Sequence, residues 1–208
     1  TFSSMGTFLV PALLFSYCQD KQWFHYNALD HKPHNLLIDT VLILSIVIIP
    51  VVALVSQWNQ AIKLPDSMSN ITAWMQKTED AAAAMLNMMT AEHTYSALVV
   101  NILVMALVPA ICEEFMFQGT IQVFLTKWIN KPHAAIWITA LIFSIIHFEF
   151  NGFFPRLLLG AYLGYLFYWS RSLWLPILAH FLHNALSIMI DFTFQGRGIS
   201  IDNVNITD

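Results

Sequence analysis

Two adjacent carboxylates, two imidazoles and an amide lie within long apolar runs of this sequence. Glu113 and Glu114 follow one another in one run, His147 lies near the end of the next, and His180 and Asn184 lie in the last. An ionisable group at membrane depth costs about 2.5–3.5 kcal/mol on insertion scales, so its presence there needs a reason. We interpret these five residues as candidates for catalysis.

These are the groups that the hydrolysis of a peptide bond by water requires. A buried carboxylate can act as a general base, and a neighbouring imidazole can hold the water and pass on its proton. An imidazole N–H and an asparagine amide can donate hydrogen bonds to the oxyanion as it forms. Residues four apart share a helix face, so three segments can aim their side chains at one interior point. Each segment contains such a pair: Glu114 and Gln118, Phe143 and His147, His180 and Asn184.

The elements that must position these residues are membrane helices. Hydrophobic residues make up 57% of the 208 positions and charged residues 11%, whereas a soluble domain has about 25% charged residues. The net charge is −4 without a basic run, which argues against a nucleic-acid partner. The two cysteines, Cys18 and Cys112, form neither a disulfide framework nor a zinc pattern.

The apolar runs predict an all-α, polytopic transmembrane helical bundle with about six membrane segments. We expect one integral membrane domain over residues 1–208, with the motif-bearing core at about 94–192. The first run is short for a span of about 20 residues, which indicates a chain truncated at its N-terminus. The runs cover about 2–17, 36–58, 94–126, 133–150, 156–169 and 174–192.

The segment between the second and third runs has a different pattern. From Ile71 to Met89 apolar residues recur at helical spacing, while Gln76, Lys77 and Glu79 fall mostly on the other side. This pattern is typical of an amphipathic helix that lies on the membrane surface. An ordinary packing face explains it equally well.

Three ordered motifs resemble those of a known family. Glu113–Glu114–Phe115–Met116–Phe117–Gln118–Gly119 is followed by Phe143–Ser144–Ile145–Ile146–His147 and by His180–Phe181–Leu182–His183–Asn184. Together they resemble the CPBP family, the CAAX prenyl endopeptidase-like and bacteriocin-processing membrane proteins, also called the Abi family. The resemblance covers about residues 101–185.

The resemblance implies an intramembrane endopeptidase in the bacterial inner (cytoplasmic) membrane. Glu113 would activate the water, and His147 would assist it. His180 and Asn184 would stabilise the oxyanion, and Glu114 would be a supporting carboxylate. We predict no cofactor, and zinc held by Glu113, His147 and His180 is the alternative. The expected partners are the lipid bilayer, a membrane-embedded or lipid-anchored peptide substrate and further membrane proteins.

One position departs from the family pattern. The first motif of the family usually ends in Arg–Gly, whereas this sequence has Gln118–Gly119. Glutamine can hydrogen-bond to the carboxylates but cannot pair with their charge. The change leaves the base, the imidazoles and the amide in place, but it makes prenylated CAAX substrates a less secure expectation.

Other interpretations of the same residues remain open. The glutamates can be structural, with hydrogen bonds to the backbone near Pro109. Cys112 can be a nucleophile, although a buried cysteine is usually inert. His183 is three residues from His180, so we expect it on another side of the helix, in a packing role. The whole protein can also be a catalytically degraded scaffold or immunity-type binding protein, or a small proton-conducting transporter.

Overall fold

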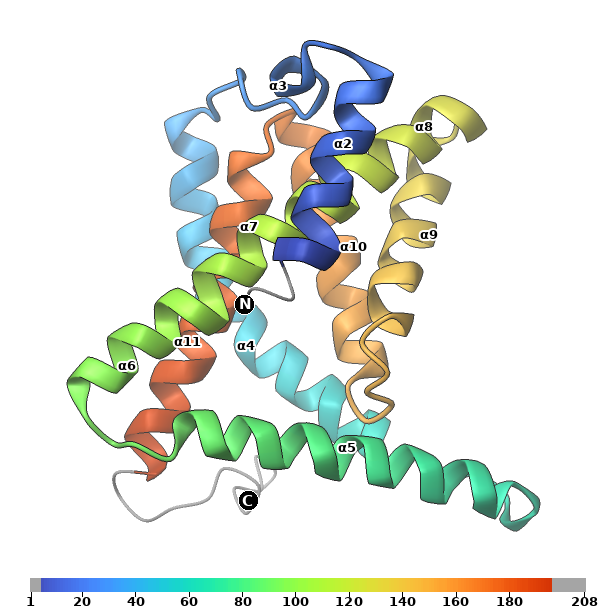
Figure 1. Ribbon diagram of the computed structural model, residues 1–208, viewed down its shortest axis with the longest axis vertical. Coiled ribbons are helices and arrows are strands. Elements are labelled where there is room, and N and C mark those ends of the chain that lie inside the picture. Colours follow the sequence, from blue (N-terminus) through green and yellow to red (C-terminus); the bar gives the residue numbers. More distant parts are fainter. Residues whose placement is uncertain (1–4, 196–208) are drawn as a thin grey trace.

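The computed structural model describes residues 5–195, and every regular element in that range is a helix. The helices run side by side, except for one that lies across an end of the bundle (Figure 1). The helices are α2 (Val10–Gln19), α3 (Trp23–Tyr26), α4 (Asn35–Gln60), α5 (Ser69–Thr90), α6 (Tyr95–Asn101), α7 (Val108–Glu114), α8 (Val123–Ile129), α9 (Pro132–Ile145), α10 (Phe153–Ser170) and α11 (Trp174–Gln195).

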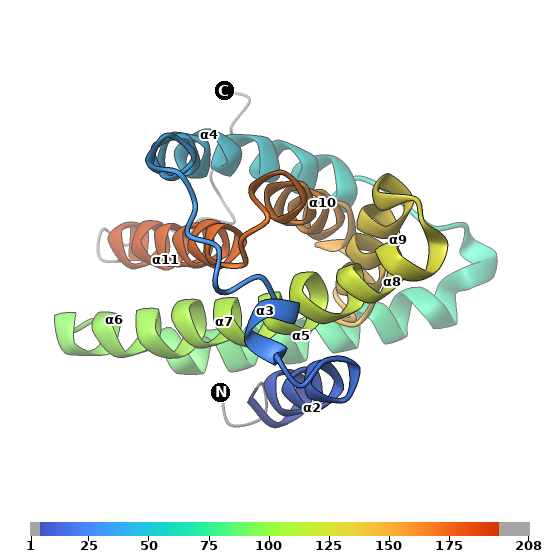
Figure 2. The same ribbon diagram turned by 90° about the horizontal axis from the view of Figure 1, so that it is seen from above.

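The expected all-helical membrane class is confirmed. Among the described residues, three helices are long and apolar enough to cross a membrane: Asn35–Gln60, Tyr95–Ile129 and Trp174–Gln195. Met5–Gln19 and Pro132–Ile145 are shorter apolar helices. Large apolar side chains of α4 remain exposed on the bundle, as expected for a surface that faces lipid. Seen from above, α2 and α4 lie on opposite sides of the bundle (Figure 2).

The helix that carries the glutamates is continuous from Tyr95 to Ile129 but contains two π-helical stretches. π-helical turns occupy Ile102–Leu107 and Phe115–Gln122, on either side of α7. Pro109 lies in the first turn of α7, and proline lacks the N–H that an α-helix uses and crowds the preceding turn. π-helical turns inside longer helices occur frequently at functional sites.

α9 and α10 pack closely because α10 presents two glycines. A Cβ atom on Gly160 would lie 3.1 Å from the Ala140 Cα, and one on Gly164 would lie 2.9 Å from the Ile136 Cγ2. Small residues of this kind let helix backbones approach each other in membrane proteins. The contact fixes α9, which leads into the second motif, against α10.

α9 ends earlier than the apolar run suggested. The expected segment reached residue 150, but the helix stops at Ile145 and a turn follows. Phe148 in this turn has φ of 52°, which is a left-handed conformation that a helix cannot contain. His147 therefore lies beyond the helix end, and our placement of it on the same helix as Phe143 was wrong.

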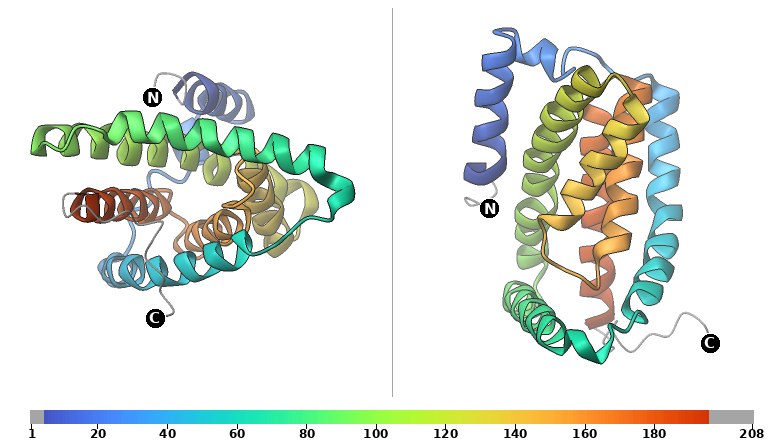
Figure 3. Two further views of the ribbon diagram at one scale, coloured as in Figure 1. Left: turned by 90° about the horizontal axis from the view of Figure 1, so that it is seen from below. Right: turned by 90° about the vertical axis from the view of Figure 1, so that its right-hand side faces the viewer.

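The predicted amphipathic segment is the helix α5, and none of its described residues is buried. It extends across one end of the bundle (Figures 1 and 3). Glu79 accepts a hydrogen bond from the Asn151 backbone N–H at 2.7 Å and a second from the Asn151 side chain. The ring centroids of Trp74 and Phe150 lie 5.4 Å apart. The helix is confirmed, while its place on a membrane surface stays a prediction.

Candidate active site

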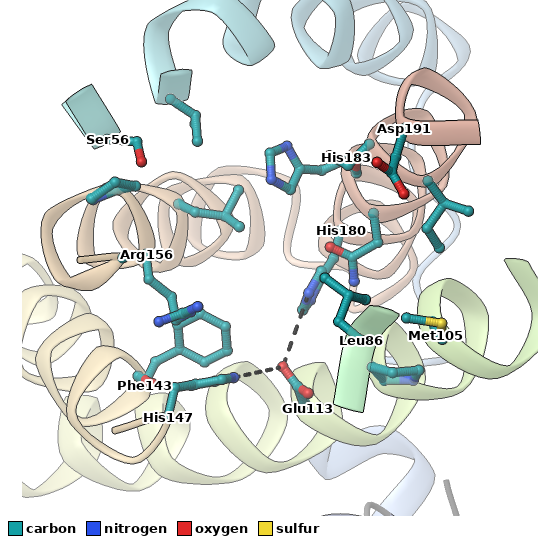
Figure 4. A pocket seen from close by; sticks show the side chains of 18 of the residues that line it. Ser56, Leu86, Met105, Glu113, Phe143, His147, Arg156, His180, His183 and Asp191 are labelled. Atoms are coloured by element: carbon teal, nitrogen blue, oxygen red, sulfur yellow. Dashed lines mark hydrogen bonds and ion pairs between the residues drawn. The ribbon is translucent and has the colours of Figure 1, made fainter. Parts of the chain in front are cut away.

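A cavity of about 650 Å³ lies between α4, α5, the 95–129 helix, α9, α10 and α11. Four of the five predicted catalytic residues line it: Glu113, His147, His180 and Asn184. The side chains of Glu113, His147 and His180 point toward one another across the cavity (Figure 4). The structure therefore brings the three motifs to one place, as the spacing of the motifs predicted.

Glu113 lies between the two imidazoles. Its Oε2 atom is 3.8 Å from the His147 Nε2 and 4.0 Å from the His180 Nε2. Both distances exceed that of a direct hydrogen bond. The side chain of Glu113 is 11% exposed and borders the cavity, so a small reactant can reach it there.

The tautomer of His147 follows from its hydrogen bond to the backbone. Its Nδ1 lies 2.6 Å from the Phe143 carbonyl oxygen, and a carbonyl can only accept. Nδ1 therefore carries a proton and donates, which leaves Nε2 directed toward Glu113. The neutral ring presents a lone pair on this side, the form that receives a proton or orients a water molecule.

Glu114 points away from the cavity and pairs with His180. The His180 Nδ1 lies 2.8 Å from the Glu114 Oε1, and Glu114 is 0% exposed. Its other oxygen, Oε2, has no hydrogen-bond partner among the residues that the structure describes. A carboxylate that receives the Nδ1–H of a histidine fixes the orientation of the ring and its tautomer. Glu113 and Glu114 are thus neighbours in sequence with different surroundings.

Phe143 supports both histidines from one side. Its ring centroid lies 4.8 Å from that of His147, 6.1 Å from that of His180 and 4.9 Å from that of Phe117, in edge-on geometry each time. The side chain is buried. Phe143 thus packs against both imidazole rings and holds them in place.

The last motif contributes one residue more to the cavity wall than expected. Asn184 lines the cavity, and so does His183, which we had expected on another side of the helix. That expectation was wrong because residues three and four apart both lie close to the direction of the first on a helix. The His183 Nδ1 has no hydrogen-bond partner within the described part of the chain.

The first motif ends in two residues with structural constraints. Gln118 is 1% exposed, and its Oε1 has no partner among the described residues. A Cβ atom on Gly119 would lie 2.6 Å from the Asn27 Oδ1 and 3.3 Å from the Leu173 Cδ2. Gly119 therefore lets the segment before α4 approach the motif helix. Cys112 is buried but does not line the cavity, which gives no support to a thiol nucleophile.

Arg156 and Asp191 also line the cavity, and sequence reasoning assigned them no role. Arg156 lies in α10, just after the turn that follows the second motif, and forms an ion pair with Glu149. The sequence does show that Arg156 is a positive charge at the start of an apolar run. Its contact with the site depends on how α10 packs, which the sequence alone does not show.

The zinc alternative requires Glu113, His147 and His180 to converge on one point. Zinc ligands at about 2.0–2.1 Å from the metal in a tetrahedron lie about 3.3 Å from one another. The observed separations of 3.8 and 4.0 Å are wider. No group of three or more His, Cys, Asp or Glu among the described residues is arranged to hold a metal ion. We derive no step through a metal.

The fold and the cavity define a polytopic helical membrane protein with a carboxylate–imidazole site. Residues 95–186 match the family model described as Type II CAAX prenyl endopeptidase Rce1-like, and this match supports a CAAX-type membrane-protease fold. The matched segment includes all three motifs, so the resemblance read from them is confirmed.

A curated relative is similar to part of the chain. The chain is 28% identical over 90 residues to the uncharacterized protein YpbD of Bacillus subtilis (strain 168). The alignment covers 41% of this chain and 43% of that protein, so the chain spans less than half of the relative's length. No solved structure matches the chain.

Proposed function

We propose that the protein is an intramembrane endopeptidase that hydrolyses a peptide bond in a membrane-associated peptide or protein. The observation that carries the proposal is the position of the Glu113 Oε2, within 4.0 Å of the Nε2 atoms of His147 and His180. A carboxylate between two imidazoles at a cavity wall is an arrangement that can activate water. The match to a CAAX-type membrane-protease family supports the same reaction class.

In this mechanism, Glu113 takes a proton from a water molecule that His147 orients through its Nε2 atom. The water oxygen attacks the carbonyl carbon of the substrate, and the carbonyl oxygen becomes an oxyanion. The proton on Glu113 then passes to the leaving nitrogen as the C–N bond breaks. The products are a carboxylic acid and an amine, and the site returns to its starting state.

The oxyanion would accept hydrogen bonds from Asn184 and His180. The Nδ1–H of His180 already donates to Glu114, so the ring donates from Nε2 only when both nitrogens carry a proton. The negative charge of Glu114 compensates for this second proton. Donors fixed in advance near the developing charge each contribute about 10²–10³-fold to such reactions.

A substitution with a matched control tests the proposal. A library of N-terminally lipidated peptides in proteoliposomes is incubated with the protein, and the products are identified by mass spectrometry. Glu113→Gln should lower the cleavage rate by about 10²–10⁴-fold, while Glu92→Gln, at an exposed glutamate, should leave it unchanged. Equal rates in both variants and the wild type would rule out this mechanism.

Removal of metal ions tests whether cleavage depends on zinc. Because no step is assigned to zinc, cleavage should persist after dialysis against a strong chelator. Loss of activity that zinc alone restores would favour the alternative ligand set of Glu113, His147 and His180. We further propose the cytoplasmic membrane of a bacterium as the location, which is supported by the bacterial source of the relative.

A second candidate function is a non-enzymatic scaffold or immunity-type binding protein. Gln118 favours it, because the buried carboxylates have no arginine partner at this position. Under this hypothesis, Glu113→Gln would leave the cellular function intact, whereas changes to the exposed face of α5 would abolish it.

A further inference from the structure

The path of the chain gathers two different sets of loops at the two ends of the bundle. The loops 20–34, 129–131 and 171–173 meet at the end that also holds α3, whereas α5 and the turn after α9 lie at the opposite end (Figures 1 and 3). The Trp174 Nε1 donates a hydrogen bond to the Leu29 carbonyl at 2.9 Å and ties the first set together. We name the two ends the α3 end and the α5 end.

Basic side chains gather at the α3 end. Its lysines and arginines are all exposed: Lys21, Lys32, Lys127, Lys131 and Arg171. At the α5 end, the exposed lysines among the described residues are Lys63 and Lys77, while Arg156 lines the cavity and pairs with Glu149. The remaining basic residue, Arg197, lies outside the described residues. The exposed cations of the described chain are thus concentrated at one end.

Acidic side chains have the opposite distribution. The α3 end carries Asp20, Asp30 and Asp39. The α5 end carries twice as many among the described residues: Asp66, Glu79, Asp80, Glu92, Glu149 and Asp191. Lysines and arginines in short loops place those loops in the cytoplasm, and the anionic lipids of the cytoplasmic leaflet attract basic segments. The charges therefore match the α3 end to the cytoplasmic leaflet.

The catalytic cavity lies in the half of the bundle next to the α5 end. Its wall includes Leu86 of α5, Gly152 of the turn after α9 and Asp191 near the end of α11. No described residue of the α3-end loops lines it. On the side of the cavity toward the α3 end, the core is filled by side chains that are 0% exposed: Phe117, Ile136, Leu163 and Leu173. Water and a substrate therefore enter the cavity from the α5 end.

We propose that the α3 end binds the anionic headgroups of the cytoplasmic leaflet and that the cavity opens on the extracytoplasmic face of the membrane. The substrate is then a peptide or protein that presents its cleaved bond on that face, after export or as part of a membrane-spanning chain. This substrate class rests on the proposed peptidase function and membrane. The orientation itself rests on the charges and the cavity alone.

Single cysteines report the orientation without any cleavage. The background is Cys18→Ser, in which the remaining cysteine, Cys112, is buried. Three exposed residues are then replaced one at a time: Ser67→Cys at the α5 end, Ser187→Cys on the cavity wall and Gln22→Cys at the α3 end. Bacterial cells that express the full chain are treated with a membrane-impermeant maleimide, either with an intact cytoplasmic membrane or after lysis. We expect the first two variants to be labelled in intact cells and the third only after lysis.

A charge swap tests whether the basic loops set the orientation. Lys21→Gln and Lys131→Gln are combined with Gln76→Lys and Asp80→Lys, two exposed positions of α5. The α5 end then has more exposed lysines and arginines than the α3 end, so Gln22→Cys should become labelled in intact cells. The matched control combines Gln76→Asn and Asp80→Asn, which change the same positions of α5 without adding cations and should leave the labelling pattern as it was.

Three results would overturn the proposal. Labelling of Gln22→Cys but not of Ser67→Cys in intact cells would show the opposite orientation. Labelling of Ser187→Cys only together with Gln22→Cys, or from neither side, would show that the cavity does not open at the α5 end. Protection of Gln22→Cys in the charge-swapped protein would show that the basic loops do not hold the α3 end in place. If the labelling is as expected and no peptide is cleaved, the peptidase function fails and the orientation stands.

Discussion

The motif helices and α5 form two walls of the same cavity, but they are built in different ways. The motif helices contact each other through aromatic rings and a buried His180–Glu114 pair. α5 has no buried residue among those described and contacts the turn after α9 through Glu79 and Trp74. Leu86 and Thr90 of α5 nevertheless line the cavity.

This difference in packing indicates different roles for the two walls: one holds the reacting groups in place, and the other lets the substrate enter. A reaction that needs groups within a few tenths of an ångström of their place requires a rigid support, and the motif helices provide it. Elements with few buried contacts open locally at low cost in free energy. We therefore expect the motif helices to fix the chemistry, and α5 to be the wall that moves when a substrate enters.

Among the changes that compare the two walls, the largest expected effect concerns the buried His180–Glu114 pair. Glu114→Gln should lower the rate of peptide cleavage by about 10- to 100-fold, because a charged hydrogen bond contributes about 1.5–3 kcal/mol. The side chain keeps its shape, so the change tests the charge that holds His180. Cleavage kinetics of this variant and of Glu113→Gln in proteoliposomes check it. An effect as large as that of Glu113→Gln would give Glu114 the more direct role.

The next effect concerns the packing of α9 against α10. Gly160→Ala should destabilise the fold by about 1–3 kcal/mol, because overpacking forces neighbouring backbones apart, and the new Cβ would lie 3.1 Å from the Ala140 Cα. Gly6→Ala is the matched control, since nothing lies within 4 Å of a Cβ there. Thermal unfolding in detergent measures both. Equal melting temperatures would show that the close approach is not a constraint.

A smaller effect is expected at the contact of α5. Glu79→Gln should weaken the attachment of this helix by about 0.5–1.5 kcal/mol, the usual contribution of a hydrogen bond, without a change in global stability. Hydrogen exchange of α5 amides should become faster, while exchange in α9 and α10 stays the same. Asp80→Asn, which alters only an exposed contact with Gln76, serves as the control. Faster exchange throughout the bundle would contradict the division into two walls.

The smallest effect concerns the exposed pair of His25 and Asp30, which has the same kind of contact as the buried His180–Glu114 pair. His25 lies 2.7 Å from Asp30 in the loop before α4, and this contact raises the pKa of His25 above its ordinary value of 6.5. The same contact lowers the pKa of Asp30 below 3.8. The contribution of the pair to stability is therefore present between about pH 4 and 6.5 and is lost above and below that window.

An NMR titration of the histidine ring protons measures this pKa. In Asp30→Asn the pKa of His25 should fall back toward 6.5, and unfolding should hardly change because the pair is in water. A pKa of His25 that is the same in both proteins would show that the contact does not form in solution.

Much of the fold followed from the sequence because the bilayer restricts the choices. Apolar runs of this length form helices in lipid, and three motifs on successive runs indicated that Glu113, His147, His180 and Asn184 could meet at one cavity. Gly160 and Gly164 are four residues apart, so helical spacing alone puts both on one face of α10.

Other features depended on packing and backbone geometry. The end of α9 at Ile145 is set by the left-handed Phe148, which no hydrophobic pattern reveals. The π-helical turns around Glu113 change how the 95–129 helix presents its side chains. Arg156 reaches the cavity only because α10 packs there. The spacing of the third motif alone did not predict that His183 lines the cavity.

A double-mutant cycle of peptide cleavage tests the central claim that Glu113 and His147 activate one water molecule together. If the two act as a unit, Glu113→Gln and His147→Gln each lower the rate by about 10²–10⁴-fold, and the double variant is no slower than the slower single one. If the two losses multiply, or if either variant cleaves as fast as the wild type, the residues do not share a water and the account is contradicted.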